Sequence, residues 1–182
     1  GRKINKSSLA FLVDWLLVIG IMTSAICFEL VGPVERVVIP DDTIRYPFAT
    51  SETVPPWWLS ILSIIIPSLL LIAFIKGFKR SSWQMVHLAI LGLLITVSLT
   101  YFLTNVIKLS TGRLRPDFMS RCQPQENGTL PVMCTGDPRK VREGRKSFPS
   151  GHTSYTFAGM GYLSFFLLGH IHLEGHGCKS VK

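Results

Sequence analysis

Charged residues are scarce in this sequence, and one long segment has none. Only 16% of the 182 residues are Asp, Glu, Lys or Arg, against about 25% in a typical soluble domain. The segment 57–75 contains no charged residue and no polar face, so a helix formed there would be apolar on all sides. A soluble bundle that buries such helices in one core is therefore disfavoured, and the shortage of charge indicates a membrane protein.

Repeats and low-complexity segments are also absent, and cysteine is rare. The length fits a single domain. Of the four cysteines, Cys27 falls in an apolar run, where it serves as a small packing residue, and Cys178 lies near the C-terminal end with no partner in view. Only Cys122 and Cys134 share one segment.

Apolar residues are abundant, at 47% of the chain with a mean hydropathy of +0.36. A helix needs roughly 20 apolar residues to cross a bilayer. We therefore predict an all-α integral membrane protein with four transmembrane helices, the last more polar than the others: 9–31, 57–75, 85–107 and 153–173. A signal peptide is the alternative for the first run, but that run is longer than a usual signal core and no A-x-A-like site follows it.

The basic residues predict the orientation. They are concentrated in 1–8, 76–84 and 174–182, which the positive-inside rule assigns to the cytosol. The segment 32–56 has two basic and four acidic residues, as expected for a luminal loop. The segment 108–152 must then be luminal too, although it carries nine Lys or Arg residues. An anionic ligand would explain that excess.

The basic loop contains two covalent-modification candidates. Cys122 and Cys134 would face an oxidising lumen, which permits a disulfide, but free thiols are equally compatible with the sequence. Between them, Asn127-Gly128-Thr129 is an N-glycosylation sequon. Such sequons occur often by chance, so Asn127 supports the luminal assignment only weakly.

Two short motifs lie at the ends of this loop. The first is K-x6-R-P, from Lys108 to Pro116, at the luminal end of the third predicted helix. The second is P-S-G-H, residues 149–152, just before the fourth. Because both helix ends face the same side of the membrane, we expect the two motifs to converge.

The residue types in these motifs suit a phosphate. Lys108 and Arg115 are cations able to hold phosphate oxygens. Ser150 is a natural N-cap, Gly151 allows close approach of the backbone, and a helix N-terminus attracts anions. His152 can donate a proton near neutral pH. Each residue alone has an ordinary structural explanation, such as snorkelling, capping or hydrogen bonding; their joint occurrence favours a phosphate pocket with a general acid.

The two motifs resemble the first two signature motifs of the type 2 phosphatidic acid phosphatase superfamily and match every fixed position. The segments 112–124, 133–137 and 143–148 are especially similar to the diacylglycerol pyrophosphate phosphatase-like phospholipid phosphatases (the phospholipid phosphatase 4 and 5 group). The likeness is strong over 101–169; before that, it extends mainly to the order of helices and loops.

The resemblance implies a six-helix bundle, of which these four helices form the first part, with a luminal or extracellular active site. It implies metal-independent hydrolysis of lipid phosphates such as phosphatidate, lysophosphatidate and diacylglycerol pyrophosphate through a phosphohistidine. Lys108, Arg115, Ser150 and Gly151 would bind phosphate, and His152 would protonate the leaving oxygen. No cofactor is expected, and Asp117 and Glu143 are too few and too scattered for a Mg²⁺ site.

A third family motif, S-R-x5-H-x3-D, supplies the nucleophilic histidine and is not found in these 182 residues. His170, His172 and His176 would lie at the far end of the fourth helix, roughly 30 Å from His152, and His87 is similarly remote. We therefore expect a truncated product or partial gene model that binds phosphate at best. The alternative is a truncated, non-catalytic phosphate- or lipid-binding regulator of a full-length sibling.

Other functions fit less well. Vanadate-dependent haloperoxidases share the pocket motifs but are soluble, and the stretch 134–137 favours the phospholipid branch over glucose-6-phosphatases and sphingosine-phosphate phosphatases. For a transporter, Asp14, Glu29 and His87 are the only candidates near the spans, and they lie close to the ends. We expect a phospholipid phosphate substrate in the endoplasmic reticulum or plasma membrane and no nucleic-acid partner; the sequence leaves a homo-oligomer open.

Overall fold

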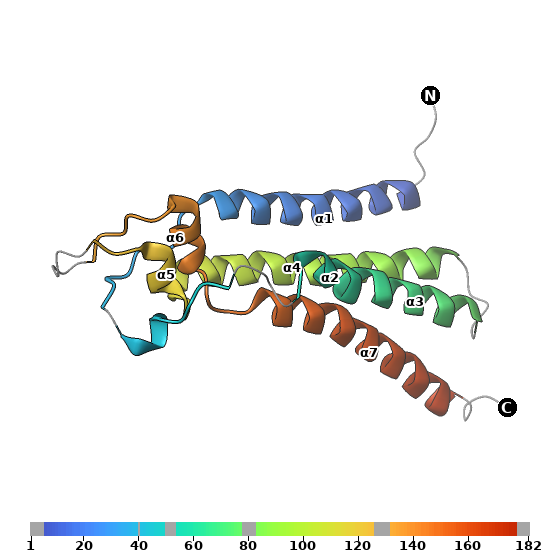
Figure 1. Ribbon diagram of the computed structural model, residues 1–182. Coiled ribbons are helices and arrows are strands. Elements are labelled where there is room, and N and C mark those ends of the chain that lie inside the picture. The colour runs from blue at the N-terminus through green and yellow to red at the C-terminus, as the bar shows by residue number, and fades with distance from the viewer. Residues whose placement is uncertain (1–5, 40, 50–53, 78–82, 126–131, 178–182) are drawn as a thin grey trace. The chain divides into compact units, whose positions relative to one another are not determined.

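The computed structural model describes residues 6–39, 41–49, 54–77, 83–125 and 132–177. Within these ranges the chain is mostly helical and has no β-strand, only an isolated bridge between Pro124 and Cys134 (Figure 1). The elements in chain order are α1 (Lys6–Leu30), the 3₁₀ turn η1 (Asp42–Ile44), α2 (Pro56–Ser60), the π-helical turn η2 (Ile61–Ile65), α3 (Ile66–Gly77), α4 (Trp83–Thr111), α5 (Phe118–Cys122), α6 (Pro138–Gly144) and α7 (Gly151–Gly177).

Among the described residues, three segments are long and apolar enough to cross a membrane: Phe11–Leu30, Pro56–Gly77 and Trp83–Thr111. The shortest has 20 residues and is therefore about 30 Å long, which matches the hydrocarbon core of a bilayer. These segments confirm the prediction of an all-α membrane protein. The predicted fourth span is present as helix α7, but glycines, hydroxyl residues and histidines dilute its apolar character, so the count of four is not confirmed.

Helix α4 extends further than its apolar run predicts. It continues four residues past 107 and ends where Gly112 adopts a positive φ of 53° and donates its N–H to Lys108 O (3.2 Å). Glycine reaches this left-handed conformation without steric cost and commonly terminates helices. Lys108 therefore lies in the last turn of α4, and the assignment of Lys108 to the loop was wrong.

The chain divides into two compact units. The helical unit comprises residues 1–23, 56–101 and 152–182, and the loop unit comprises residues 24–55 and 102–151. The division cuts α1 and α4 and falls between the first two residues of α7. Each unit has its own buried cluster, so each is described by itself.

The helical unit is held together by aliphatic side chains and close glycine contacts. Its buried cluster comes from α3, α4 and α7: Leu71, Ile75, Val86, Ala89, Leu93, Val97 and Leu163. At Gly159 of α7 the backbone lies so close to η2 that an added Cβ would stand 2.1 Å from Ser63 O. Small residues that allow helices to approach in this way are typical of membrane helix packing.

The π-helical turn η2 ends two residues before Pro67, which is the second residue of α3. Proline has no N–H to donate, so the carbonyl four residues earlier, that of Ser63, loses its usual helical partner. A π turn is one way in which membrane helices accommodate such a proline. The backbone of Gly159 packs against the carbonyl that this adjustment exposes.

The loop unit has a smaller core, formed by Val38, Ile44, Phe118 and Cys122. Phe118 is fully buried, with the Arg145 guanidinium 5.2 Å from its ring centre. The short helices α5 and α6 pack against each other beside this core (Figure 1). This arrangement places α6 near the end of α4, where the candidate site lies.

Candidate functional site

Part of the first motif meets the segment that precedes the second motif in the loop unit. Residues 111–115, which begin at the last residue of α4, lie alongside residues 144–148, which begin at the last residue of α6. Three hydrogen bonds join them: Arg115 N to Gly144 O (2.8 Å), Ser147 N to Arg113 O (3.0 Å) and Thr111 Oγ1 to Phe148 O (3.1 Å). Residues far apart in the sequence are thus fixed side by side by main-chain contacts.

A polar pocket of about 230 Å³ lies next to this junction. It is lined by residues of α1, α4 and α6 and the segment that follows α6: Glu29, Asn105, Lys108, Leu109, Glu143 and Lys146. Lys108 therefore shares a pocket with a second lysine and two carboxylates.

The charges of this pocket are partly paired within the chain. Lys146 Nζ lies 2.7 Å from Glu143 Oε1, and the lysine side chain is only 13% exposed, against 52% for the glutamate. The buried Asn105 donates to Glu29 Oε1 at 3.3 Å. Lys108 is attracted electrostatically by both glutamates and repelled by Lys146 and Arg115. The pocket thus holds cations whose partners come from the protein itself.

Arg115 belongs to the same electrostatic cluster. It interacts with Lys108, and its backbone is fixed by the bond to Gly144 and by Phe118 N, which donates to Arg115 O at 3.0 Å. Its Nε is buried and has no hydrogen-bond partner among the described residues. Buried donors are nearly always paired in folded proteins, and an arginine fork fits the oxygens of a phosphate.

The remaining predicted residues of the second motif lie at the start of α7. Ser150 is exposed, and Gly151, the last residue of the loop unit, begins the helix. His152 is exposed and belongs to the helical unit, so it is described apart from Lys108 and Arg115. On the same continuous helix, His170 lies about 27 Å from His152 at 1.5 Å per residue. The roles of Ser150, Gly151 and His152 stay predictions.

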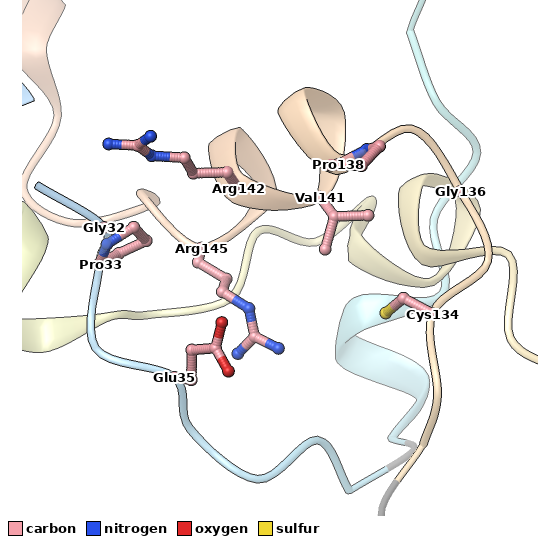
Figure 2. Close-up of a pocket in the computed structure, with 9 residues that line it drawn as sticks. All are labelled: Gly32, Pro33, Glu35, Cys134, Gly136, Pro138, Val141, Arg142 and Arg145. Carbon is pink, nitrogen blue, oxygen red and sulfur yellow. The ribbon is translucent and has the colours of Figure 1, made fainter. Parts of the chain in front are cut away.

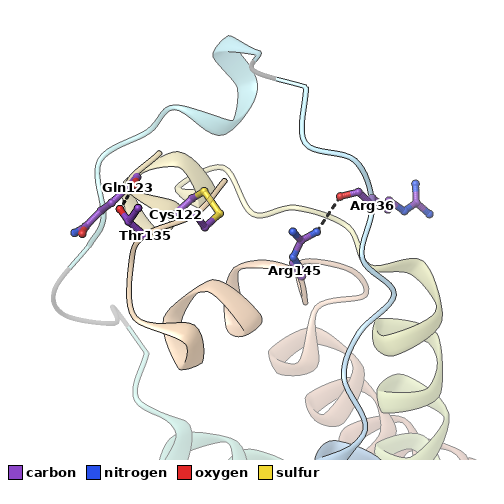
Figure 3. Close-up of a disulfide and its surroundings, with 6 residues drawn as sticks. Arg36, Cys122, Gln123, Thr135 and Arg145 are labelled. Carbon is purple, nitrogen blue, oxygen red and sulfur yellow. Dashed lines mark hydrogen bonds between the residues drawn. A yellow bond between two sulfur atoms is a disulfide. The ribbon is translucent and has the colours of Figure 1, made fainter. Parts of the chain in front are cut away.

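A disulfide joins Cys122 and Cys134 (Figure 3), which is one of the two states that the sequence left open. Cys122 is fully buried, and its carbonyl accepts hydrogen bonds from Thr135 N and Gly136 N, both at 2.9 Å. The bond therefore fastens the end of α5 to the segment leading into α6. The predicted glycosylation site, Asn127, lies outside the described residues.

A second pocket in the loop unit, of about 380 Å³, lies between residues 32–35 and α6, with Cys134 and Gly136 on its wall. Figure 2 shows Arg145 and Glu35 pointing toward each other in it. Arg145 donates to Arg36 O at 3.0 Å (Figure 3), and Arg142 donates to Glu29 O at 2.6 Å and Val31 O at 2.8 Å. Although Arg142 also has a buried Nε without a partner among the described residues, its terminal nitrogen ties the loop together.

Sequence reasoning missed part of the polar pocket. Asn105 was not considered, and Glu29 was considered only as a weak candidate for transport. Both are polar residues within or beside an apolar run, and polar residues in membrane helices are commonly functional. That signal would have found them, but their proximity to Lys108 depends on the packing of α1 against α4.

Comparison with protein families and curated proteins agrees with the two motifs. The model of the PAP2 superfamily matches residues 89–177, a range that contains Lys108, Arg115 and the P-S-G-H segment. No solved structure matches the chain.

Three curated relatives illustrate the similarity. Lipid phosphate phosphatase 2 of Arabidopsis thaliana is 39% identical over 176 residues, which cover 91% of this chain and 60% of the relative. The probable diacylglycerol pyrophosphate phosphatase 1 of Schizosaccharomyces pombe is 36% identical over 178 residues (93% and 63%). Diacylglycerol pyrophosphate phosphatase 1 of Saccharomyces cerevisiae is 40% identical over 152 residues (78% and 53%).

The chain spans between half and two thirds of the length of these relatives. Residues 89–177, which match the family model, contain both motifs. The domain match and these relatives show that the chain contains a PAP2 superfamily domain over residues 89–177.

Proposed function

We propose that this chain carries the phosphate-binding part of a membrane lipid phosphate phosphatase. The observation that carries the proposal is the cluster of Lys108 and Arg115 at the hydrogen-bonded junction of the two motif segments. Support comes from relatives named lipid phosphate phosphatase and diacylglycerol pyrophosphate phosphatase and from apolar helices that keep the chain in the bilayer with its substrate.

The proposed substrates are phosphomonoesters and pyrophosphates of lipids, including phosphatidate, lysophosphatidate and diacylglycerol pyrophosphate. The acyl chains stay in the bilayer, and the charged head group enters the loop unit. Following the charge distribution along the chain, we assign the loop unit to the luminal or extracellular side of the endoplasmic reticulum or plasma membrane.

In the proposed reaction a nucleophile attacks phosphorus in line with the leaving oxygen. Negative charge builds up on the three equatorial phosphoryl oxygens, where Lys108, Arg115 and the first N–H groups of α7 stabilise it. As the phosphorus–oxygen bond breaks, the leaving oxygen takes a proton from His152. It departs as an alcohol from a phosphomonoester and as the lipid monophosphate from a pyrophosphate. The resemblance assigns the nucleophile to a third motif that these 182 residues do not contain. We therefore assign to these residues the binding of the phosphate and the proton transfer to the leaving oxygen.

The test is phosphate release from phosphatidate in mixed micelles by the full-length protein that carries this sequence, with EDTA present. Arg115→Lys keeps the charge but loses the planar fork, and we expect a loss of about 10²–10³-fold in kcat/KM. Arg113→Lys is the matched control, because Arg113 is exposed and its guanidinium lies 6.0 Å from the centre of the Phe148 ring. Equal activity of the two variants would contradict the assignment of Arg115.

A further inference from the structure

We propose that Lys146 is a further phosphate-binding residue, and that Glu143 holds it in the pocket until a phosphate takes the place of the carboxylate. The inference rests on the proposed function. Lys146 belongs to neither signature motif, yet it lines the same pocket as Lys108. Its side chain is 13% exposed, which is low for a lysine that is not engaged in binding.

The backbone around Lys146 is fixed on both sides. Gly144 O accepts from Arg115 N, and Ser147 N donates to Arg113 O. An added Cβ at Gly144 would stand 2.9 Å from the Phe118 ring, so the segment lies directly against the core of the loop unit. Lys146 is therefore set in register with Arg115 rather than placed on a free surface.

Cations outnumber carboxylates around the pocket when Arg115 is counted with Lys108 and Lys146, against Glu29 and Glu143. Lys108 is repelled by both Lys146 and Arg115, and three cations this close together need negative partners. Glu143 supplies one of them, but it is half-exposed and lies only three residues before Lys146. A phosphate bound between Lys108 and Lys146 brings up to two negative charges and three acceptor oxygens, while Glu143 can turn toward water.

The alternative is that Glu143 and Lys146 form only a structural ion pair between near neighbours. Pairs of that kind at a protein surface contribute little to stability. The two explanations predict different effects of Glu143→Gln on phosphate binding. If the pair is structural, Glu143→Gln leaves phosphate binding unchanged; if Glu143 competes with phosphate, its removal strengthens binding.

The experiment measures equilibrium binding of lysophosphatidate to the purified chain in detergent micelles, with monoacylglycerol as the lipid that lacks phosphate. We expect Lys146→Met to weaken lysophosphatidate binding about tenfold, the effect of one charge-assisted hydrogen bond. Glu143→Gln should tighten it severalfold. Lys140→Met is the matched control, because Lys140 is exposed on α6 and lies outside the pocket, and it should bind as the wild type does.

The outcomes separate the inference from the proposed function. If the wild type does not prefer lysophosphatidate to monoacylglycerol, the proposed function fails. If Lys108→Met loses that preference while Lys146→Met and Glu143→Gln both match the wild type, the inference alone is overturned. If thermal unfolding shows that Lys146→Met does not fold, the inference is decided by Glu143→Gln, which should bind lysophosphatidate more tightly than the wild type.

Discussion

The helical unit packs through glycines and aliphatic side chains, whereas the loop unit is held by arginines and a disulfide. In the helical unit, the closest backbone approach is that of Gly159 to Ser63. In the loop unit, Arg142 and Arg145 donate to main-chain carbonyls more than 100 residues earlier in the chain. The two units differ because their surroundings differ. Helices in a bilayer associate through close van der Waals packing, whereas a loop of this size in water has little apolar surface to bury.

The basic loop, residues 108–152, uses its cations for the fold as well as for a ligand. Its nine Lys and Arg residues first indicated an anionic ligand, but several serve the fold. Arg121 pairs with Asp117 at 2.8 Å and lies over the Phe48 ring, and Arg142 and Arg145 hold carbonyls. The cations that the proposed ligand uses are Lys108 and Lys146, which line the polar pocket, and Arg115 beside them. Net charge therefore overstates the size of the binding site.

The largest expected effect concerns His152, the first residue of the helical unit after the loop. If it supplies the proton, His152→Ala lowers kcat of the full-length protein that carries this sequence about 10²–10⁴-fold and leaves lysophosphatidate binding to the loop unit nearly unchanged. His170→Gln, far along the same helix, is the control. Steady-state phosphate release measures kcat, and equilibrium binding measures the affinity for lysophosphatidate. A parallel loss of both would assign His152 to phosphate binding instead of proton transfer.

The disulfide should matter to the loop unit alone. Replacing both Cys122 and Cys134 by serine removes a constraint spanning 12 residues, worth about 3 kcal/mol in the chain-entropy description. Amide hydrogen exchange should then accelerate in α5 and α6 while α3 and α4 stay protected. Cys27→Ser, at an exposed position in α1, is the control and should leave hydrogen exchange in both units unchanged. Faster exchange throughout the chain in the double cysteine variant would show that the two units do not unfold separately.

Glycine contacts should matter to the helical unit alone. Gly159→Ala forces a Cβ against Ser63 O, whereas Gly161→Ala on the same helix meets nothing within 4 Å. We expect Gly159→Ala to lower the stability of the helical unit by about 1–3 kcal/mol, seen as a lower Tm in micelles. Gly161→Ala should match the wild type. Equal Tm values for the two variants would mean that the close approach at Gly159 is absent.

The smallest effect concerns Arg142. Arg142→Met removes two hydrogen bonds to carbonyls, each worth about 1 kcal/mol. The loop unit should become slightly less stable, while its affinity for lysophosphatidate changes less than that of Lys146→Met. Proteolysis at residues 32–39 provides a local measure, with Lys140→Met as control. A loss of lipid phosphate binding as large as that of Lys146→Met would place Arg142 in the binding site.

Much of the fold follows from the sequence, because charge-free runs such as 57–75 leave few alternatives to a membrane helix. The short helices α5 and α6 and the π turn before Pro67 were not predicted. They depend on the packing of Phe118 and on the close approach of Gly159 to η2, neither of which leaves a periodic pattern. The end of α4 was misplaced because hydropathy falls at Lys108, whereas the helix ends only at Gly112.

For the site, spacing alone identified Lys108 and Arg115. It could not identify the pocket's other residues, because Glu29 comes from α1 and meets Asn105 of α4 across 76 residues of sequence. Nor could it separate structural arginines from ligand-binding ones, since Arg142 finds its carbonyl partner 113 residues away. Which polar residues meet in the pocket is set by tertiary contacts, which motif spacing does not reveal.

The phosphate-binding role of Lys108 is tested most directly by comparing the equilibrium binding of lysophosphatidate with that of monoacylglycerol, in EDTA, for the purified chain and its Lys108→Met variant. We predict that the wild type prefers the phosphate-bearing lipid at least about tenfold, as one charge-assisted contact would give. Lys108→Met should abolish this preference and keep the wild-type Tm. Equal affinity of the wild type for both lipids, or an unchanged preference in Lys108→Met, would contradict that role.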